Sequence, residues 1–197
     1  MGLLVTELKA RSLPVGGFVA VIWLAELVDL FFLRGSLDYL GIRPRDLGWL
    51  WGIVLAPFLH GGMAHLIANT VPLLVLGWLV AVRRRVDFFL VTAVVTLLGG
   101  LGVWLLARPG TIHLGASGVV FGYLGYLLLR AWFERSGTAM LIALIAGFLY
   151  GGALWGLLPT QPGISWEGHL FGFAGGATTA RFVGRRQPLF GRTAYTV

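Results

Sequence analysis

A serine and a histidine are the residues with which this chain could break a covalent bond. Ser117 stands where a glycine-rich stretch turns into an apolar segment, and His169 begins another apolar segment. A serine hydroxyl is a weak nucleophile until a neighbouring base takes its proton, and imidazole is the commonest such base. No carboxylate is placed to orient that imidazole, because Glu167, two residues away, projects from another side of a helix. The pattern indicates a serine–histidine dyad in which packing orients the base.

Glycine spacing supplies a way to bring the two residues together. Glycines recur at intervals of three or four residues in both segments: Gly118, Gly122 and Gly125 in one, and Gly168, Gly172 and Gly176 in the other. Small residues at this spacing let two membrane helices approach closely. We therefore expect Ser117 within reach of His169, with Phe121 packed against the imidazole. The alternative for an isolated serine at a helix start is an N-cap.

Donors for the oxyanion of a tetrahedral intermediate are also present. The candidates are the backbone N–H of Ser117, the side-chain amide of Asn69 and the imidazole of His65, which lies one helical turn before Asn69 on the same face. The dipole of the helix that begins at Ser117 would add a favourable field. The alternative for Asn69 and His65 is interhelical hydrogen bonding, which is common in membranes.

Three of these polar residues are expected at one depth. An arginine marks the inner end of each segment, and the separations are similar: Asn69 lies 14 residues before Arg83, Ser117 lies 13 before Arg130, and His169 lies 12 before Arg181. At about 1.5 Å per residue, all three would sit roughly 18–21 Å above the inner boundary of a core about 30 Å thick. Polar groups inside a bilayer are costly and usually mark function. We expect a shared, wet site open to the outer side.

The segments that carry these residues belong to a chain built for the membrane. Of its 197 residues, 57% are hydrophobic and only 12% are charged, too few charges to cover a soluble domain. The chain has no cysteine, which excludes disulfides, thiolate metal sites and a cysteine nucleophile. Apolar stretches near the 20 residues that cross a hydrocarbon core recur along it. We expect a single all-α, polytopic domain over residues 1–197.

Six apolar segments define the expected six-transmembrane-helix bundle. They cover residues 14–33, 65–82, 88–107, 117–129, 138–158 and 169–180. The fourth and sixth are short, so each should begin below the outer surface and leave a polar hollow above it. A further apolar run, residues 49–59, is too short to span and is interpreted as an interfacial or re-entrant part of the first loop.

The positions of the cations predict orientation in the membrane. With the N-terminus inside, the inner side holds Lys9, Arg11, Arg83, Arg84, Arg85, Arg130, Arg135, Arg181, Arg185, Arg186 and Arg192, and the outer side holds Arg34, Arg43, Arg45 and Arg108. We expect a multi-pass protein of the cell membrane with both termini in the cytoplasm. The same placement accounts for the net charge of +7 without a nucleic-acid partner.

Three motifs, in this order, resemble the signatures of rhomboid intramembrane proteases. They are His60-Gly61-Gly62-Met63-Ala64-His65-Leu66-Ile67-Ala68-Asn69, Gly115-Ala116-Ser117-Gly118 and Gly168-His169-Leu170-Phe171-Gly172. The resemblance covers all six segments and implies a rhomboid-like bundle with a membrane-associated first loop. It implies that Ser117 is the nucleophile and His169 the base, while His65 and Asn69 contribute to the oxyanion site. His60 matches an additional histidine that many family members carry in the first loop. A structural hydrogen bond within that loop explains it at least as well as a functional role.

The resemblance also implies the kind of substrate and its route of entry. The substrate would be a transmembrane segment of another membrane protein that unwinds near its outer end, with a small residue before the cut bond. The fifth span and residues 158–166, with Pro159, Pro162 and Gly163, would form a lateral gate and cap. Membrane lipids would surround the protein, and no cofactor or metal is expected. The natural substrate and the oligomeric state stay open.

Two rival functions remain. One is a catalytically silent relative that binds or escorts membrane proteins, although such relatives usually lack the serine or the histidine. The other is a haem or metal protein that uses His65 and His169, which would give Ser117 and Asn69 no task; the chain lacks the His-Glu-x-x-His sequence of zinc proteases. His113 is given a loop or substrate-contact role at most. Glu26 and Asp29, in the outer half of the first segment, are interpreted as facing the wet hollow or forming internal hydrogen bonds.

Overall fold

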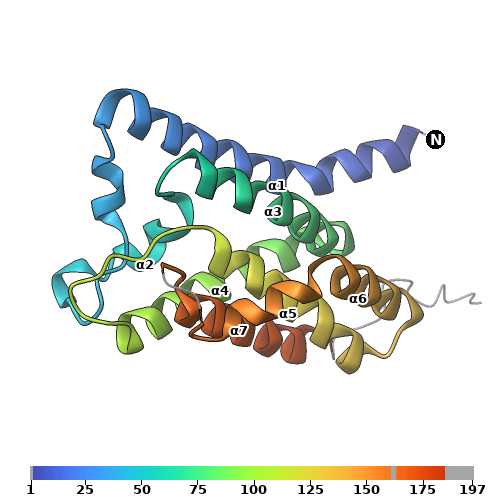
Figure 1. The fold of residues 1–197 in the computed structure, drawn as a ribbon. Coiled ribbons are helices and arrows are strands. Elements are labelled where there is room, and N and C mark those ends of the chain that lie inside the picture. The colour runs from blue at the N-terminus through green and yellow to red at the C-terminus, as the bar shows by residue number, and fades with distance from the viewer. Residues whose placement is uncertain (1, 161–162, 185–197) are drawn as a thin grey trace, which may run out of the picture.

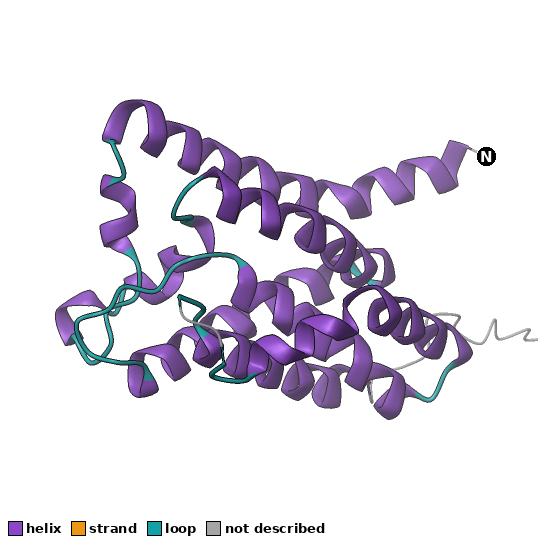
Figure 2. Cartoon of the chain, viewed as in Figure 1, coloured by secondary structure: helices purple, strands orange, loops and turns teal. Residues whose placement is uncertain are grey.

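A computed structural model of the chain describes residues 2–160 and 163–184. Within these ranges the regular secondary structure is helical, with no strand and one isolated bridge between Ile42 and His113 (Figures 1 and 2). The all-α prediction is therefore confirmed. Pro162 of the expected cap, and Arg185, Arg186 and Arg192 of the expected inner side, lie outside the described residues.

Each of the six expected segments, apart from the end residues Ala107 and Leu158, falls in one helix or in a helix and its direct continuation. These helices are α1 (Gly2–Val28, continued by a π-helical turn Asp29–Leu33), α3 (Met63–Arg83), α4 (Arg85–Leu106), α5 (Ser117–Glu134), α6 (Gly137–Tyr150, continued by the 3₁₀ segment Gly151–Leu157) and α7 (Trp166–Gly184). Four of the described helical stretches are long and apolar enough to cross a membrane, namely Thr6–Leu33, Met63–Arg83, Arg85–Leu106 and Gly137–Leu157. The other two, α5 and α7, carry Ser117 and His169.

Several helix boundaries differ from the prediction. The first helix begins at Gly2 instead of residue 14, and α5 and α7 end at Glu134 and Gly184 instead of residues 129 and 180. Hydropathy marks only the apolar part of a helix, but a helix continues through charged residues that pair one turn apart. Glu7 and Arg11 in α1 form such a pair, with an O···N distance of 2.8 Å.

The first loop, between α1 and α3, is built from short helical turns. They are Ser36–Leu40, Leu47–Trp49, α2 (Gly52–Leu55) and Ala56–Phe58. Ile42, Ile53 and Ala56 of this loop are buried against Val103 and Ala107 at the end of α4. The run that was expected to be interfacial is therefore packed onto the bundle on at least one side.

Helix α5 lies at the centre of the bundle. All its residues from Val119 to Leu127 are buried, and it contacts α3, α4, α6 and α7. Helix α7 packs most extensively on α5 and next on α4, whereas α1 packs chiefly on α3 (Figure 1). Helix α6 buries only Ala139 and Ala146, so most of its apolar surface faces outward, as suits contact with lipid.

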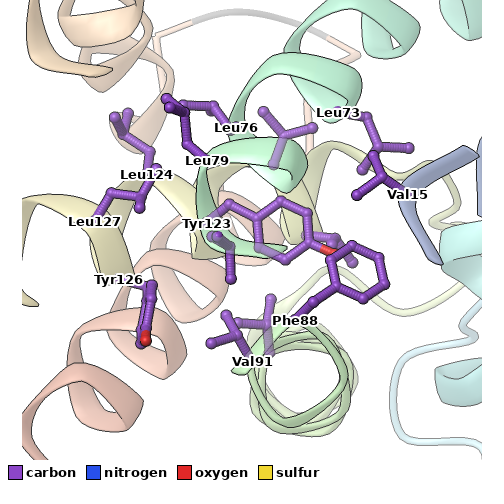
Figure 3. Close-up of a cluster of buried hydrophobic side chains, with 14 of the residues drawn as sticks. Val15, Leu73, Leu76, Leu79, Phe88, Val91, Tyr123, Leu124, Tyr126 and Leu127 are labelled. Atoms are coloured by element: carbon purple, nitrogen blue, oxygen red, sulfur yellow. The ribbon is translucent and has the colours of Figure 1, made fainter. Parts of the chain in front are cut away.

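The apolar core forms where α1, α3, α4 and α5 meet. In Figure 3, side chains from these helices, among them Val15, Leu73 and Phe88, gather around Tyr123. Tyr123 is completely buried, and its phenol bonds Thr92 Oγ1 at 2.6 Å. Because Thr92 donates its own proton to the carbonyl of Phe88 at 2.6 Å, the phenol is the donor. Its one polar group is thus satisfied inside the core.

Charged side chains gather where α3 ends, α4 begins and α5 ends. Arg83 Nη2 donates to both carboxylate oxygens of Glu134 at 2.6 Å, and Arg130 Nε donates to Glu134 at 2.7 Å. Arg130 also pairs with Asp87, which accepts from the phenol of Tyr126 at 2.8 Å. The side chains of Arg83, Arg130, Asp87 and Glu134 are all at most 4% exposed. This closed network joins three helices at the end of the bundle away from Ser117.

The variant Glu134→Gln is expected to lower the free energy of unfolding by about 3–5 kcal/mol, because it leaves the buried guanidinium of Arg83 without its carboxylate partner and leaves Arg130 with Asp87 alone. The matched control is Glu7→Gln, which breaks an Arg–Glu pair of the same one-turn spacing whose carboxylate is 66% exposed. That change should cost about 0–1 kcal/mol. Reversible unfolding in detergent measures both. Equal losses would mean that the buried network does not stabilise the bundle.

Candidate active site

Ser117 and His169 lie side by side in the structure. Ser117 is the first residue of α5, and its Oγ is 2.9 Å from Nε2 of His169. Nδ1 of His169 lies 3.0 Å from the carbonyl oxygen of Gly156. A carbonyl can only accept, so Nδ1 carries the ring proton of a neutral imidazole and Nε2 is left to accept from the serine hydroxyl. Protons are thus arranged for transfer from Ser117 to His169.

The capping alternative for Ser117 does not fit this geometry. The N-cap position of α5 is Ala116, and no side chain makes a capping hydrogen bond there. The hydroxyl of Ser117 instead bonds the histidine of another helix. At the start of α5 the hydroxyl of Ser117 therefore makes a tertiary contact with α7 and does not cap its own helix.

An aromatic ring and a carbonyl hold the imidazole. Phe121, one turn into α5, stacks on His169 with ring centroids 4.0 Å apart and planes 12° from parallel. Gly156, in the 3₁₀ segment that continues α6, supplies the carbonyl. A Cβ at Gly156 would lie 3.0 Å from Phe121 and 3.3 Å from Nδ1 of His169, so the absence of a side chain lets this carbonyl approach.

Glycines let the two helices that carry the serine and the histidine touch through their backbones. A Cβ built on Gly172 would overlap the carbonyl of Gly118, and one built on Gly176 would overlap the carbonyl of Gly122. A Cβ on Gly125 would likewise overlap the carbonyl of Phe173. Close contact of this kind sets the separation of α5 and α7 along their length.

His65 lies against the loop that leads to Ser117. Its Nδ1 accepts from the backbone N–H of Gly61 at 3.4 Å, so the proton of the neutral ring is on Nε2. A Cβ on Gly115 would meet Nε2 of His65 at 2.7 Å, and Gly115 has a φ of +119°, a conformation that glycine tolerates best. Nε2–H is therefore a donor beside the residues that precede Ser117.

Asn69 lies one turn beyond His65 and is buried. Its Nδ2 donates to the carbonyl of His65 at 3.0 Å, within the same helix. That bond uses one of its two amide hydrogens. These contacts differ from the interhelical hydrogen bonds that were the alternative for both residues. His65 accepts from Gly61 in the first loop, and Asn69 donates to the carbonyl of His65 in its own helix, α3.

His60 is enclosed between the first loop and the start of α5. It is 1% exposed, its Nε2 accepts from the N–H of Ala116 at 3.4 Å, and its ring meets that of His65 edge-on with centroids 5.1 Å apart. Burial, and next the proximity of His65, lower the pKa of His60 to about 4. The side chain is therefore a neutral acceptor that ties the loop to the residue before Ser117.

A cavity of about 710 Å³ opens over these groups. It is lined by His65, Asn69, Ser117 and His169, and on its other sides by Arg108, Thr111, Ile112, His113, Leu114, Gly163, Ile164, Ser165, Trp166 and Glu167. A second hollow of about 50 Å³ reaches Ser117 from the side of the first loop and α4. The structure thus gathers the expected polar residues around one open cavity large enough for a peptide segment.

Sequence reasoning missed some residues of this site. Gly156 contributes through its carbonyl, which every residue type has, so only its place among the glycines of residues 151–156 hinted at a close approach. Ser165 and Glu167 also line the cavity; Ser165 lies within the expected cap without a role of its own, and Glu167 was weighed only as a partner for His169. His113 was assigned to the loop, where it stands, although its contacts are more extensive than expected.

Together these features define a multi-pass helical membrane protein that holds a serine–histidine pair in an open cavity. Comparison with known proteins agrees. Residues 47–186 match the model of the Rhomboid domain, so the chain belongs to the rhomboid family. Members of that family are typically intramembrane serine proteases, and the resemblance drawn from the three motifs is confirmed at this level.

Individual relatives cover most of the chain. An uncharacterized protein of Mycobacterium tuberculosis is 45% identical over 172 residues, which make up 83% of this chain and 71% of the relative. A Bacillus subtilis protein named "Putative rhomboid protease YdcA" is 27% identical over 181 residues, 84% of this chain and 86% of its own length. RHOMBOID-like protein 4 of Arabidopsis thaliana is 31% identical over 152 residues, 72% of this chain and 36% of its own length.

The variant Gly176→Ala is expected to lower the free energy of unfolding by about 1–3 kcal/mol or more, because its methyl group overlaps the backbone of α5. The control is Gly16→Ala in α1, where an added Cβ meets nothing within 4 Å. Removing that glycine from a helix should be neutral or stabilising by up to about 1 kcal/mol. Unfolding in detergent measures both. Equal effects would show that the α5–α7 separation is not fixed by backbone contact.

The variant His60→Gln is expected to reduce the loss of unfolding free energy that the parent protein shows as the pH falls from 7 to 4. The pKa of folded His60, about 4, lies below the unfolded value of 6.5, so the unfolded state takes up protons first. Stability that is fully present above pH 6.5 is lost as the pH falls towards 4. Glutamine keeps an acceptor near Nε2 but does not titrate. Unfolding free energies measured from pH 7 to pH 4 should fall less in the variant; an unchanged slope would contradict the assignment.

Proposed function

We propose that this chain is an intramembrane serine endopeptidase that cuts transmembrane segments of other membrane proteins. The observation that carries the proposal is the hydrogen-bond relay from the carbonyl of Gly156, through the ring of His169, to the hydroxyl of Ser117. The relay leaves Nε2 as an acceptor beside a hydroxyl at the floor of an open cavity. Membership of the rhomboid family points to the same activity.

The reaction follows from the positions of the protons. Ser117 Oγ attacks the scissile carbonyl carbon while its proton moves to Nε2 of His169, which becomes an imidazolium ion. The imidazolium then protonates the leaving amine as the C–N bond breaks, which leaves an acyl-enzyme on Ser117. Water gives a proton to Nε2 and attacks the ester, and collapse of the second tetrahedral intermediate returns the proton to Ser117. Stacking on Phe121 and the bond to Gly156 keep the ring in one orientation throughout.

Three groups would stabilise the oxyanion. The N–H of Ser117 belongs to the first turn of α5, where backbone donors have no partner within the helix and the helix dipole is positive. His65 and Asn69 line the same cavity and would supply Nε2–H and the second amide hydrogen. Donors already in place before charge develops are worth several kcal/mol in sites of this kind. Gly115, Gly118, Gly172, Gly176 and His60 act indirectly by setting the backbone positions.

The proposal includes six membrane spans, cytoplasmic termini and a cavity that opens to the outer side. The spans come from the apolar segments, and the orientation comes from the positions of the cations. All six expected segments are helical in the part of the chain that the structure describes, and α6 presents apolar surface outward. Gly156 lies in the segment that continues α6, and its carbonyl bonds His169. Displacement of α6 by an entering substrate would therefore change the position of the His169 imidazole. This supports α6 and residues 158–166 as gate and cap.

The alternative is a catalytically silent relative that binds or escorts membrane proteins. Such a protein has no need for a hydroxyl and an imidazole at 2.9 Å, or for a carbonyl that sets the tautomer. A haem or metal role for His65 and His169 is also poorly supported, since both nitrogens of His169 are engaged in these bonds. The hydrolytic function uses each of these contacts.

Ser117→Ala is expected to abolish labelling by a fluorophosphonate probe and to lower cleavage of a model transmembrane substrate by about 10³-fold or more. His169→Ala should have a similar effect, because serine is not activated without its base. Ser36→Ala, which removes an exposed hydroxyl in the first loop, is the control and should behave as the parent protein. Cleavage that persists in folded Ser117→Ala would refute the mechanism.

A further inference from the structure

A second serine–histidine contact joins the segments that lead into α5 and α7. Nδ1 of His113, in the loop between α4 and α5, lies 2.8 Å from Oγ of Ser165, just before α7. Nε2 of His113 lies 2.8 Å from Oγ1 of Thr111. Both His113 and Ser165 line the cavity over Ser117. The proposed mechanism leaves this contact without a task.

The proton positions of this contact can be assigned. Thr111 Oγ1 donates its only proton to the carbonyl of Arg108 at 2.6 Å, so at the contact with His113 it must accept. Nε2 of His113 is therefore the protonated nitrogen, and Nδ1 accepts the hydroxyl proton of Ser165. The chain of bonds runs from Ser165 through the imidazole and Thr111 to the end of α4. Burial lowers the pKa of His113, and the nearby Glu167 partly opposes this shift. The lowered pKa favours the neutral ring that this series of hydrogen bonds requires.

The backbone of His113 is fixed as firmly as its ring. Its N–H donates to the carbonyl of Ile42 at 3.0 Å, and its carbonyl accepts from the N–H of Ile42 at 2.8 Å. This bridge ties the loop to the first loop, which passes beside it (Figure 1). A Cβ on Gly41 would lie 2.6 Å from the carbonyl of His113, so the two loops are in close contact. The imidazole therefore extends from a firm base towards Ser165.

The two residues of this contact are separated by equal numbers of residues from the two proposed catalytic residues. His113 precedes Ser117 by four residues, and Ser165 precedes His169 by four, where the N–H of His169 donates to the carbonyl of Ser165 at 3.2 Å. Ser165 thus begins the helical turn that presents His169. Any movement of Ser165 away from His113 would shift the imidazole relative to the hydroxyl of Ser117.

We propose that His113 and Ser165 are positioning residues of this protease: their hydrogen bond holds the start of α7 against the loop before α5 and so sets the distance between Ser117 and His169. The inference rests on the proposed function and adds two residues that act through the dyad. Glycine packing fixes α5 against α7 along their length. The hydrogen bond between His113 and Ser165 fixes the segments that precede these two helices. The residues need not touch substrate to act in this way.

Two substitutions at His113 separate its two bonds. In His113→Asn, Oδ1 takes the place of Nδ1 and accepts from Ser165, while the bond to Thr111 is lost. In His113→Gln, Nε2 takes the place of the ring Nε2 and donates to Thr111, while the bond to Ser165 is lost. Each variant loses one neutral hydrogen bond, so the pair is matched for stability. Ser165→Ala removes the same bond as the glutamine variant from the other side.

The experiment measures the fluorophosphonate labelling rate, and kcat and KM on a model transmembrane substrate, for the full-length variants below their unfolding temperatures. The glutamine variant and Ser165→Ala should lose about tenfold or more in labelling rate and kcat, with KM within about twofold, because displacement of a catalytic group lowers the chemical step. The asparagine variant should stay within about threefold of the parent. Rescue by asparagine is a result that a purely structural role would not give.

Other outcomes overturn the inference. Equal labelling rates in the asparagine and glutamine variants would reduce the contact to a structural one, and a raised KM with unchanged kcat would make it a substrate contact. If the parent protein is labelled and Ser117→Ala is not, these failures concern the positioning role alone. If the parent protein is never labelled, the proposed function fails and the inference falls with it.

Discussion

The close approach of α5 and α7 is the constraint on which the rest of the structure depends. Two helices in lipid gain little from the hydrophobic effect, because lipid tails are as apolar as the side chains, so van der Waals contact must hold them together. Backbone contacts at Gly122–Gly176 and Gly118–Gly172 provide it. The hydrogen bond between Ser117 and His169 tolerates only a few tenths of an ångström beyond its 2.9 Å. Helices held apart by side chains could not keep that bond.

Polar groups are handled differently at the two ends of the bundle. At one end Arg83, Arg130, Asp87 and Glu134 are paired with opposite charges and closed off from solvent, which adds connections between helices at the cost of desolvation. At the other end histidines, serines and an asparagine border an open cavity together with Arg108 and Glu167. A closed ionic end and an open polar end suit a bundle that must stay assembled while water and a peptide enter one side.

Features fixed by a periodic rule could be predicted from the sequence, and others could not. Membrane thickness and helical rise predicted, from the counts to Arg83, Arg130 and Arg181, that Asn69, Ser117 and His169 share a site, and all three line one cavity. Glycine spacing predicted which helices touch. The carbonyl of Gly156 and the contact of His113 with Ser165 lie in loops and 3₁₀ segments, where no period relates residue number to direction. Helix ends were also missed, because hydropathy does not register paired charges such as Glu7 and Arg11.

The carbonyl of Gly156 has a consequence for how such a site can work within a membrane. A carboxylate in this position would fix the same tautomer but would bring a charge into a poorly solvated place, where an unpaired charge is costly. A neutral carbonyl gives the orientation without that cost. In exchange, the orientation of the base depends on a short segment that continues α6, a helix that buries only Ala139 and Ala146. Under the proposed function, the element that a substrate must displace to enter is then also the one that holds His169 ready, so entry and activation are coupled through a single hydrogen bond.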